Sequence, residues 1–411
     1  MCGQIRVMRI LGRLNIGGPA LHVITIGNEL EERGITAALV CGPGRLDEGS
    51  MIPEAISRNI RVRVLPEIMT EMRPRMRDVF ALWKLCRIIR EEQPHIVETH
   101  TSKAGFLGRL AARIAGVPII IHTYHGHVLD GYYGRIVNWG LRNVERSLAG
   151  ITDCVVAVSE QVKQDLVRYQ VAPAEKITVI RVGVDLGEYA RCEIHRGEFR
   201  AELGFNETHR LVGIMGRLFP IKNHRLFLQA AAIVAAEISD VSFVIVGDGA
   251  LRRELENYAL KLGIGRRVIF TGWRKDQPRI YADLDVLALS SINEGTPLSV
   301  IEGMASGCPV VATRVGGVPD LIRHEENGWL VDASDSEALA RGIIGVLQQP
   351  ERAKRVAARA RSDVLRIHAK KRLLDDIESL YGGLLNRRKI CRIALPQVPN
   401  SREETNCGSS C

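Results

Sequence analysis

The chain has 411 residues, 46% of them hydrophobic, which is enough for two domains with a core each. The formal net charge of +9 favours an anionic partner, either a membrane surface or a sugar diphosphate. Nucleic acid is disfavoured, because we find no zinc-finger spacing and no aromatic-basic RNA-binding motif. Nine cysteines without a Cys-x-x-Cys pair argue against a zinc site or a disulfide framework and indicate a reduced chain in the cytoplasm.

Short β-branched runs alternate with helical stretches, a pattern typical of parallel sheets with crossover helices. It predicts an α/β fold of two Rossmann-like, doubly wound domains facing each other across a cleft. We place these domains at residues 1–185 and 186–371, with a polar linker over 185–209. Ligands of such sheets bind beyond the carboxyl ends of the strands. The predicted strands are 5–11, 36–41, 60–65, 96–99, 118–123, 154–158, 176–181, 211–215, 241–246, 268–270, 285–289 and 309–312.

The turn after the first strand contains Gly17 and Gly18, ahead of a predicted helix. Glycine lets the backbone approach a phosphate closely, and a helix start adds a favourable dipole. The turn lacks the G-x-G-x-x-G spacing, and a Gly-Gly pair is usually no more than a turn. After the fourth strand come His100 and Lys103, which either bind an acceptor or cap the next helix.

The helical spacing over residues 78–90 predicts a helix that covers a sheet. Its expected buried face consists of Val79, Leu82, Trp83, Cys86 and Ile89. The basic residues of this segment fall elsewhere on the helix.

Three histidines, His122, His125 and His127, cluster at the carboxyl end of the fifth strand. A histidine facing the cleft can form a hydrogen bond with a sugar hydroxyl or transfer a proton near neutral pH. We expect His125 in the active site and His127 near an acceptor. The segment holds no carboxylate or cysteine ligand, so we predict no metal site there.

The segment 131–146 mixes Tyr132, Tyr133 and Trp139 with arginines. This composition suits contact with an anionic lipid surface, and equally a buried amphipathic helix. No run of about 18 apolar residues occurs, so we expect no membrane-spanning helix. The N-terminus also lacks the layout of a signal peptide. The arginines are Arg135, Arg142 and Arg146.

In the second half, Arg217 and Lys222 directly follow a strand. Their cations can project from its carboxyl end and neutralise a leaving diphosphate, or they can be ordinary surface charges. Gly247 ends the next strand, and Trp273 with Arg274 follows the strand after that. These turns are expected at the same edge of the second sheet.

Glu294 and Glu302 form the most informative pair in the chain. The pattern predicts a strand, a turn holding Glu294, and a helix with Thr296 as N-cap and Pro297 in the first position. Gly307 is expected to end this helix. Glu302 would lie in the second turn and lean back toward the helix start, whose N–H groups can receive a phosphate. The alternative is a capping turn followed by a solvated glutamate.

Residues 293–320, with these two glutamates, a small-residue helix, a strand and a Gly-Gly turn, resemble glycosyltransferase family 4. That family comprises retaining nucleotide-sugar glycosyltransferases of the GT-B fold, and the resemblance extends from the first strand to about residue 385. It implies a C-terminal helix, residues 372–386, that crosses back to the N-terminal domain. The remaining residues, 387–411, have the composition of a disordered tail.

The resemblance also implies roles for individual residues. Arg217 and Lys222 would stabilise the leaving diphosphate, Glu294 and His125 would act at the sugar, and Glu302 would bind the ribose. Acceptor contacts fall to His100, Lys103 and His127. The implied donor site consists of Gly17, Gly18, Arg217, Lys222, Gly247, Trp273, Arg274, Glu294, Gly295, Thr296, Pro297, Leu298, Ser299 and Glu302.

We therefore predict a metal-independent hexosyltransferase without a cofactor. It would move a sugar from a nucleotide diphosphate donor, by preference a UDP-sugar, to a hydroxyl acceptor such as a lipid-linked glycan, retaining the anomeric configuration. Cell-surface polysaccharide or glycolipid biosynthesis in the cytoplasm, with peripheral contact to anionic lipid at the inner face of the plasma membrane, would fit this activity. The alternatives are a non-hydrolysing nucleotide-sugar 2-epimerase of the same fold and a non-catalytic sugar-nucleotide-binding protein.

Overall fold

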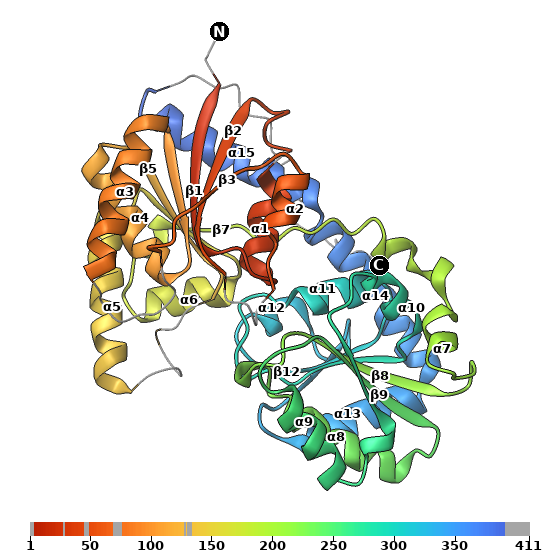
Figure 1. Cartoon of the computed structure of the whole chain (residues 1–411). Coiled ribbons are helices and arrows are strands. Elements are labelled where there is room, and N and C mark those ends of the chain that lie inside the picture. Colours follow the sequence, from red (N-terminus) through yellow and green to blue (C-terminus); the bar gives the residue numbers. More distant parts are fainter. Residues whose placement is uncertain are drawn as a thin grey trace, which may run out of the picture.

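The computed structural model describes residues 4–27, 29–44, 49–68, 76–126, 129 and 134–390. These residues form two α/β domains, one red to yellow and the other green to blue (Figure 1). Both sheets are parallel throughout their described strand pairs, which confirms the predicted GT-B-like α/β fold class. Residues 391–411 of the predicted tail lie outside the described residues.

The N-terminal domain is a seven-stranded sheet with helices on both faces (Figure 1). Its elements are β1 (Ile5–Arg13), α1 (Gly18–Gly27), β2 (Ile35–Gly42), α2 (Ile52–Ser57), β3 (Arg61–Val64), α3 (Met76–Glu92), β4 (Ile96–His100), α4 (Ser102–Ala115), β5 (Ile119–Tyr124), α5 (Arg135–Gly150), β6 (Cys154–Ala157), α6 (Glu160–Arg168), η2 (Ala174–Lys176) and β7 (Ile177–Val179). The strand order is β3-β2-β1-β4-β5-β6-β7. The order reverses between β1 and β4, where Val7 pairs with Ile96.

The C-terminal domain has a six-stranded sheet of order β10-β9-β8-β11-β12-β13. Its elements are η3 (Tyr189–His195), α7 (Glu198–Glu202), β8 (Arg210–Met215), η4 (Pro220–Lys222), α8 (His224–Glu237), β9 (Val241–Val246), α9 (Arg252–Lys261), η5 (Gly265–Arg267), β10 (Val268–Gly272), α10 (Gln277–Asp283), β11 (Val286–Leu289), α11 (Leu298–Ala305), β12 (Val310–Thr313), α12 (Val318–Leu321), β13 (Trp329–Val331), α13 (Ser336–Gln348) and α14 (Pro350–Ile367). The last helix, α15 (Lys370–Arg387), packs on the N-terminal domain. All twelve predicted strands are present within a few residues, and β13 is an additional edge strand.

The predicted linker is more structured than its polar composition indicated, because η3 and α7 lie within it. The side chain of Asp283 explains this order: it accepts hydrogen bonds from the N–H groups of Gly197, Phe199 and Arg200 at 2.6–3.0 Å. A carboxylate distant in sequence thus supplies the N-terminal cap of α7.

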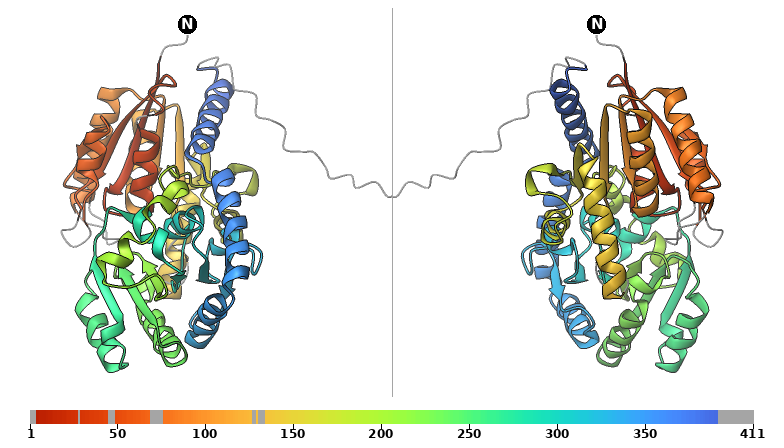
Figure 2. Two further views of the ribbon diagram at one scale, coloured as in Figure 1. Left: turned by 90° about the vertical axis from the view of Figure 1, so that its right-hand side faces the viewer. Right: turned by 90° about the vertical axis from the view of Figure 1, so that its left-hand side faces the viewer.

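The chain crosses between the domains twice, and the two crossings run side by side. The Val184 N–H donates to the carbonyl of His368 (2.9 Å), and the Lys370 N–H donates to the carbonyl of Val184 (3.1 Å). The predicted boundaries at 185 and 371 fall beside these crossings. After the second crossing, α15 returns to the N-terminal domain, where Leu373, Ile377 and neighbouring side chains join its buried core. Figure 2 shows α15 (blue) beside α1 (red).

Candidate active site

A short turn after β8 brings two cations to the carboxyl edge of the C-terminal sheet. The turn holds Arg217, whose guanidinium carbon lies 5.7 Å from the ring centroid of Phe219, and it ends in η4 with Lys222. The Ser290 hydroxyl donates to the carbonyl of Lys222 (2.9 Å), which fastens η4 to the loop after β11. The two segments that the sequence singled out separately are therefore held together.

Lys222 and Glu294 form an ion pair of 2.6 Å between Nζ and Oε1. The same carboxylate oxygen accepts a hydrogen bond of 2.6 Å from the Ser291 hydroxyl. The two charged side chains are only 22% and 11% exposed, so water screens them little. A carboxylate and a cation are therefore in direct contact where the loops after β8 and β11 meet.

Glycines allow the backbone around Glu294 to pack unusually closely. A Cβ on Gly295 would lie 1.9 Å from the carbonyl oxygen of His125, in the other domain. A Cβ on Gly316 or Gly317 would come as close to the carbonyl oxygens of Glu294 and Gly295. The Gly-Gly turn after β12 is thus required by close packing under the Glu294 loop, and Gly295 is required by contact between the domains.

Two helix starts face each other across the domain boundary. Gly18, the first residue of α1, lies with its ideal Cβ position 3.8 Å from the side chain of Leu298, the first residue of α11. The first N–H groups of a helix have no acceptor within it and attract anions. The starts of α1 and α11 are therefore in contact across the domain boundary, and the first N–H groups of both helices lie in this region.

The start of α11 differs from the prediction in one detail. Pro297 occupies the N-cap position and the helix begins at Leu298, one residue later than expected. The Thr296 hydroxyl does not cap the helix and lies 3.5 Å from the carbonyl of Val158, in the N-terminal domain. Gly307, at φ +72°, ends the helix as predicted. The Thr296 side chain, which the local sequence assigned to helix capping, forms a contact between the domains instead.

Glu302 lies in the second turn of α11 beside two tyrosines. The Tyr281 hydroxyl donates to its Oε2 (3.0 Å), and the Tyr189 hydroxyl also forms a hydrogen bond with the carboxylate. Burial raises the pKa of Glu302 to about 7, although both hydroxyls act in the opposite direction. A carboxyl group near its midpoint at neutral pH is suited to accepting a hydrogen bond from a ligand hydroxyl once it is ionised.

The turns after β9 and β10 hold three more residues of the predicted donor site, and these residues differ in their surroundings. Gly247 packs beneath the Arg217 turn, since a Cβ there would lie 2.0 Å from the Gly216 carbonyl oxygen. Trp273 follows β10 and is 39% exposed, so its ring is available for stacking. The Arg274 guanidinium, by contrast, forms ion pairs of 2.6 Å with both Glu202 and Asp276. Any donor contact from this residue would have to come from its backbone or compete with two carboxylates.

On the N-terminal side, His125 stands in a cluster of histidines. Its Nε2 lies 3.0 Å from Nδ1 of His100, and its ring centroid is 5.1 Å from that of His22 in α1. Burial lowers the pKa of each of these three histidines to about 3, so they are neutral at pH 7. Of the two roles that the sequence left open for His125, burial favours hydrogen bonding over proton transfer near neutral pH.

His100 itself is fully buried, behind His125. The predicted contact with an acceptor is thus replaced by an orienting contact to His125. His122 is likewise internal, with Nδ1 2.8 Å from the Thr99 hydroxyl. His127 lies outside the described residues. The ammonium of Lys103 pairs with Asp78 of α3 at 2.8 Å, and its side chain is only 9% exposed.

Sequence reasoning missed Glu98, which supports the histidine cluster. Its carboxylate accepts hydrogen bonds from the hydroxyls of Thr123 (2.9 Å) and Tyr381 (2.6 Å) and from Arg9 (3.3 Å). Burial by itself would raise the pKa of Glu98, but His100, Arg9 and Tyr381 together lower it to about 2. A glutamate inside an apolar strand was the available signal; nothing local pointed to Tyr381 in α15.

Among the described residues, no group of three His, Cys, Asp or Glu side chains is arranged to hold a metal ion. In the same part of the chain, no helix is both long and apolar enough to cross a membrane. The five described cysteines, Cys41, Cys86, Cys154, Cys192 and Cys308, are free and buried.

Comparison with known proteins agrees with this geometry. Residues 195–363 match the family described as glycosyl transferases group 1, and residues 16–188 match glycosyltransferase family 4. The structure of Anabaena HepE with UDP-glucose superposes with a TM-score of 0.77 at 22% identity, covering 92% of this chain and 100% of that one. The fold and the family matches thus define a nucleotide-sugar glycosyltransferase of the GT-B class.

Two sequence relatives narrow the assignment. UDP-Gal:α-D-GlcNAc-diphosphoundecaprenol α-1,3-galactosyltransferase of Escherichia coli is 31% identical over 303 residues, 73% of this chain and 78% of the relative. The putative glycosyltransferase EpsD of Bacillus subtilis is 30% identical over 312 residues, 74% and 80% of the two chains. The chain belongs to glycosyltransferase family 4, as the sequence motifs indicated, and is a hexosyltransferase of glycan biosynthesis.

Proposed function

We propose that this enzyme transfers a hexose from a UDP-sugar to a hydroxyl of a lipid-linked glycan, with retention of the anomeric configuration and without a metal. The E. coli relative uses UDP-Gal and an acceptor on diphosphoundecaprenol, and Anabaena HepE binds UDP-glucose. Both point to a uridine diphosphate donor, and the first points to an acceptor carried by a membrane lipid. Work at the cytoplasmic face of the membrane, with peripheral contact to anionic lipid, follows from such an acceptor.

One observation carries the proposal: the Lys222–Glu294 ion pair lies next to Gly295, which packs against His125 of the other domain, and just ahead of α11, whose first side chain contacts the start of α1. In the transition state of glycosyl transfer, positive charge builds on the sugar while negative charge builds on the leaving diphosphate. A carboxylate beside an ammonium matches this separation of charge if Glu294 contacts the sugar hydroxyls and Lys222 the diphosphate. Lys222 has three N–H donors, so it can hold the diphosphate without releasing Glu294.

The remaining groups fit the same pose. Arg217 and the N–H groups at the starts of α1 and α11 would stabilise the negative charge that forms as UDP departs. Such preorganised donors accelerate reactions because they need no rearrangement when the charge develops. Glu302 would accept hydrogen bonds from the ribose. His125, held neutral by burial, would bind a sugar hydroxyl.

The direct test is UDP release from a panel of UDP-sugars by Arg217→Ala, Lys222→Ala and Glu294→Gln. We expect each rate to fall by about a hundredfold or more, the usual cost of removing one transition-state donor. A matched control is the exposed pair Lys354–Glu351 in α14, at 3.0 Å, whose replacement by Lys354→Ala or Glu351→Gln should leave the rate unchanged. Near-wild-type rates in any two of the three site variants would overturn the assignment.

Product analysis then separates the remaining possibilities. Free UDP with a glycosylated product supports transfer, an epimerised donor would show a 2-epimerase, and neither product would show a binding protein. Nuclear magnetic resonance of the product reports its anomeric configuration. Full activity after dialysis against EDTA is the outcome expected for a metal-independent enzyme.

A further inference from the structure

Helix α3 exposes a row of large apolar side chains. Met76, Val79, Phe80 and Trp83 are 77%, 62%, 59% and 59% exposed. Their spacing of i, i+3, i+4 and i+7 places them on one face of the helix. We predicted that Val79 and Trp83 would cover the sheet, and this is wrong. The helix has two apolar faces, and the face that includes Ala81, Leu85 and Ile88 packs into the core instead.

Helix α5 also exposes large apolar side chains near its start. Ile136, Val137 and Trp139 are 85%, 52% and 69% exposed, while Asn138 and Leu148 face the protein. Helices α3, α4 and α5 lie together along one side of the N-terminal domain (Figure 1). We call the exposed residues Met76, Val79, Phe80, Trp83, Ile136, Val137 and Trp139 the apolar rim.

The rim lies at the carboxyl edge of the N-terminal sheet. Helices α3 and α5 each precede a parallel strand, so they run antiparallel to the strands and begin at the carboxyl edge of the sheet. The active site lies at this edge. All seven rim residues belong to the first half of their helix. An apolar surface at this edge can hold the active site close to whatever the rim binds.

The charges around the rim favour an anionic surface. Arg77, Arg135 and Arg142 belong to the first parts of α3 and α5, where the one carboxylate, Asp78, is paired with Lys103. Lys84 of α3 is neutralised by its ion pair with Glu67 and does not add to this charge. Aromatic and aliphatic side chains flanked by Lys and Arg are the composition of helices that lie in the interface of an anionic bilayer.

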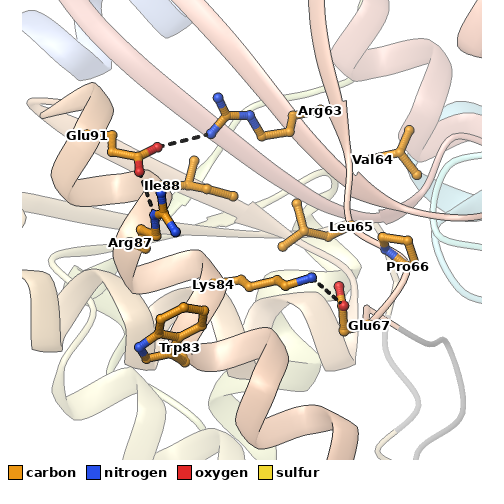
Figure 3. A pocket seen from close by; sticks show the side chains of 10 residues that line it. All are labelled: Arg63, Val64, Leu65, Pro66, Glu67, Trp83, Lys84, Arg87, Ile88 and Glu91. Carbon is orange, nitrogen blue, oxygen red and sulfur yellow. Dashed lines mark hydrogen bonds and ion pairs between the residues drawn. The ribbon is translucent and has the colours of Figure 1, made fainter.

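A cavity of about 310 Å³ lies beside the rim, and its lining does not indicate a small-molecule site. Figure 3 shows that its charged groups turn toward one another, in the pairs Lys84–Glu67 (2.6 Å) and Arg87–Glu91 (2.8 Å). Trp83 is one of the residues that line the cavity, and it is 59% exposed. The indole is therefore presented outward as an apolar group, in the position that tryptophan takes at membrane interfaces.

We infer that the apolar rim is a docking face for an anionic bilayer, which holds the active-site cleft against the membrane. This inference rests on the proposed function for the need to reach a lipid-linked acceptor. Docking itself requires neither donor nor acceptor, so it can be measured separately from activity. Because the rim includes residues of both helices, α3 and α5 would both enter the headgroup region.

The test is flotation of the full-length protein with vesicles of phosphatidylglycerol and phosphatidylcholine, and with phosphatidylcholine alone. We expect binding to the anionic vesicles that decreases with added salt. Phe80→Ser/Trp83→Ser and Ile136→Ser/Trp139→Ser should each weaken it by about tenfold or more, since they remove the inserted apolar groups. UDP release from a UDP-sugar in detergent-free buffer should stay at the wild-type rate in both.

The matched control is Ile194→Ser/Leu260→Ser, which removes two side chains that are 74% and 66% exposed in the C-terminal domain. This variant should float like the wild type. Wild-type flotation by the rim variants, or no flotation of the wild type, would overturn the inference. So would a wild-type dimer that becomes a monomer in the rim variants, because the rim would then be an interface between two copies of the chain.

Discussion

The ionisation of Glu302 gives the sharpest test of the donor site. Its pKa is raised to about 7 by burial, and the proposed role at the ribose needs the carboxylate form to accept hydrogen bonds. With that pKa, about nine-tenths of the group is ionised at pH 8 and about one-tenth at pH 6. Donor affinity should therefore be full above pH 8 and should fall as the pH drops through 7.

The size of the effect follows from the hydrogen bond. A bond to a charged acceptor is stronger than a neutral one by roughly 1–1.5 kcal/mol, which corresponds to about a tenfold change in Kd. Binding at pH 7 should also release about half a proton, since about half of Glu302 is protonated before the donor binds. His22, His100 and His125 do not contribute, because their pKa values near 3 lie below this range.

Isothermal titration calorimetry with a UDP-sugar, from pH 5.5 to pH 8.5 in buffers of different ionisation enthalpy, measures both quantities. Glu302→Gln should bind about tenfold more weakly at pH 8 than the wild type and lose the pH dependence. Tyr281→Phe removes a hydroxyl that lowers the pKa, so its midpoint should move to higher pH. A Kd that is constant from pH 6 to pH 8, without proton release, would refute this account of Glu302.

Two further predictions concern the contacts that assemble the site. Gly295→Ala inserts a Cβ 1.9 Å from a carbonyl oxygen of the other domain, so UDP release should fall at least about tenfold while small-angle scattering shows a more open molecule. Gly345→Ala, with open space around it, is the control and should change neither quantity. Equal effects of the two substitutions would contradict the reasoning. Glu98→Ala leaves the buried Arg9 unpaired and should cost about 3–5 kcal/mol in urea unfolding, whereas Tyr381→Phe should cost only about 1–2 kcal/mol. A loss below about 1 kcal/mol for Glu98→Ala would show that the network contributes little.

Much of the fold could be predicted because its signals are local. Runs of β-branched residues marked twelve strands, and their alternation with helices required parallel sheets. The single strand that was missed, β13, offers only the three apolar residues Trp329–Val331 between Gly328 and Asp332. The equally short edge strand β7 was predicted because its apolar run continues through Ile180. The predicted linker contains η3 and α7, and α7 was missed because its cap comes from Asp283 rather than from a neighbouring residue.

The site was predictable to the extent that single segments carry it. Glu294, Lys222 and Gly18 each stood out by motif and position, and the structure brings them to one interdomain region. The details beyond this depended on partners that no local pattern names. Arg274 pairs with two carboxylates, and Glu302 meets Tyr189 and Tyr281 from other elements.

The amino-acid sequence alone therefore determined the order of strands and helices, the family and the residues at the ends of the strands. Tertiary structure decided which of those side chains meet. Glu98 and Tyr381 are 283 positions apart, yet they share a hydrogen bond of 2.6 Å. The α3 helix shows the same division: periodicity revealed an apolar face, but a helix with two such faces can bury only the one that the sheet and α4 cover. Contacts between residues distant in sequence decide which face is buried, and the other face stays exposed to a partner outside the chain.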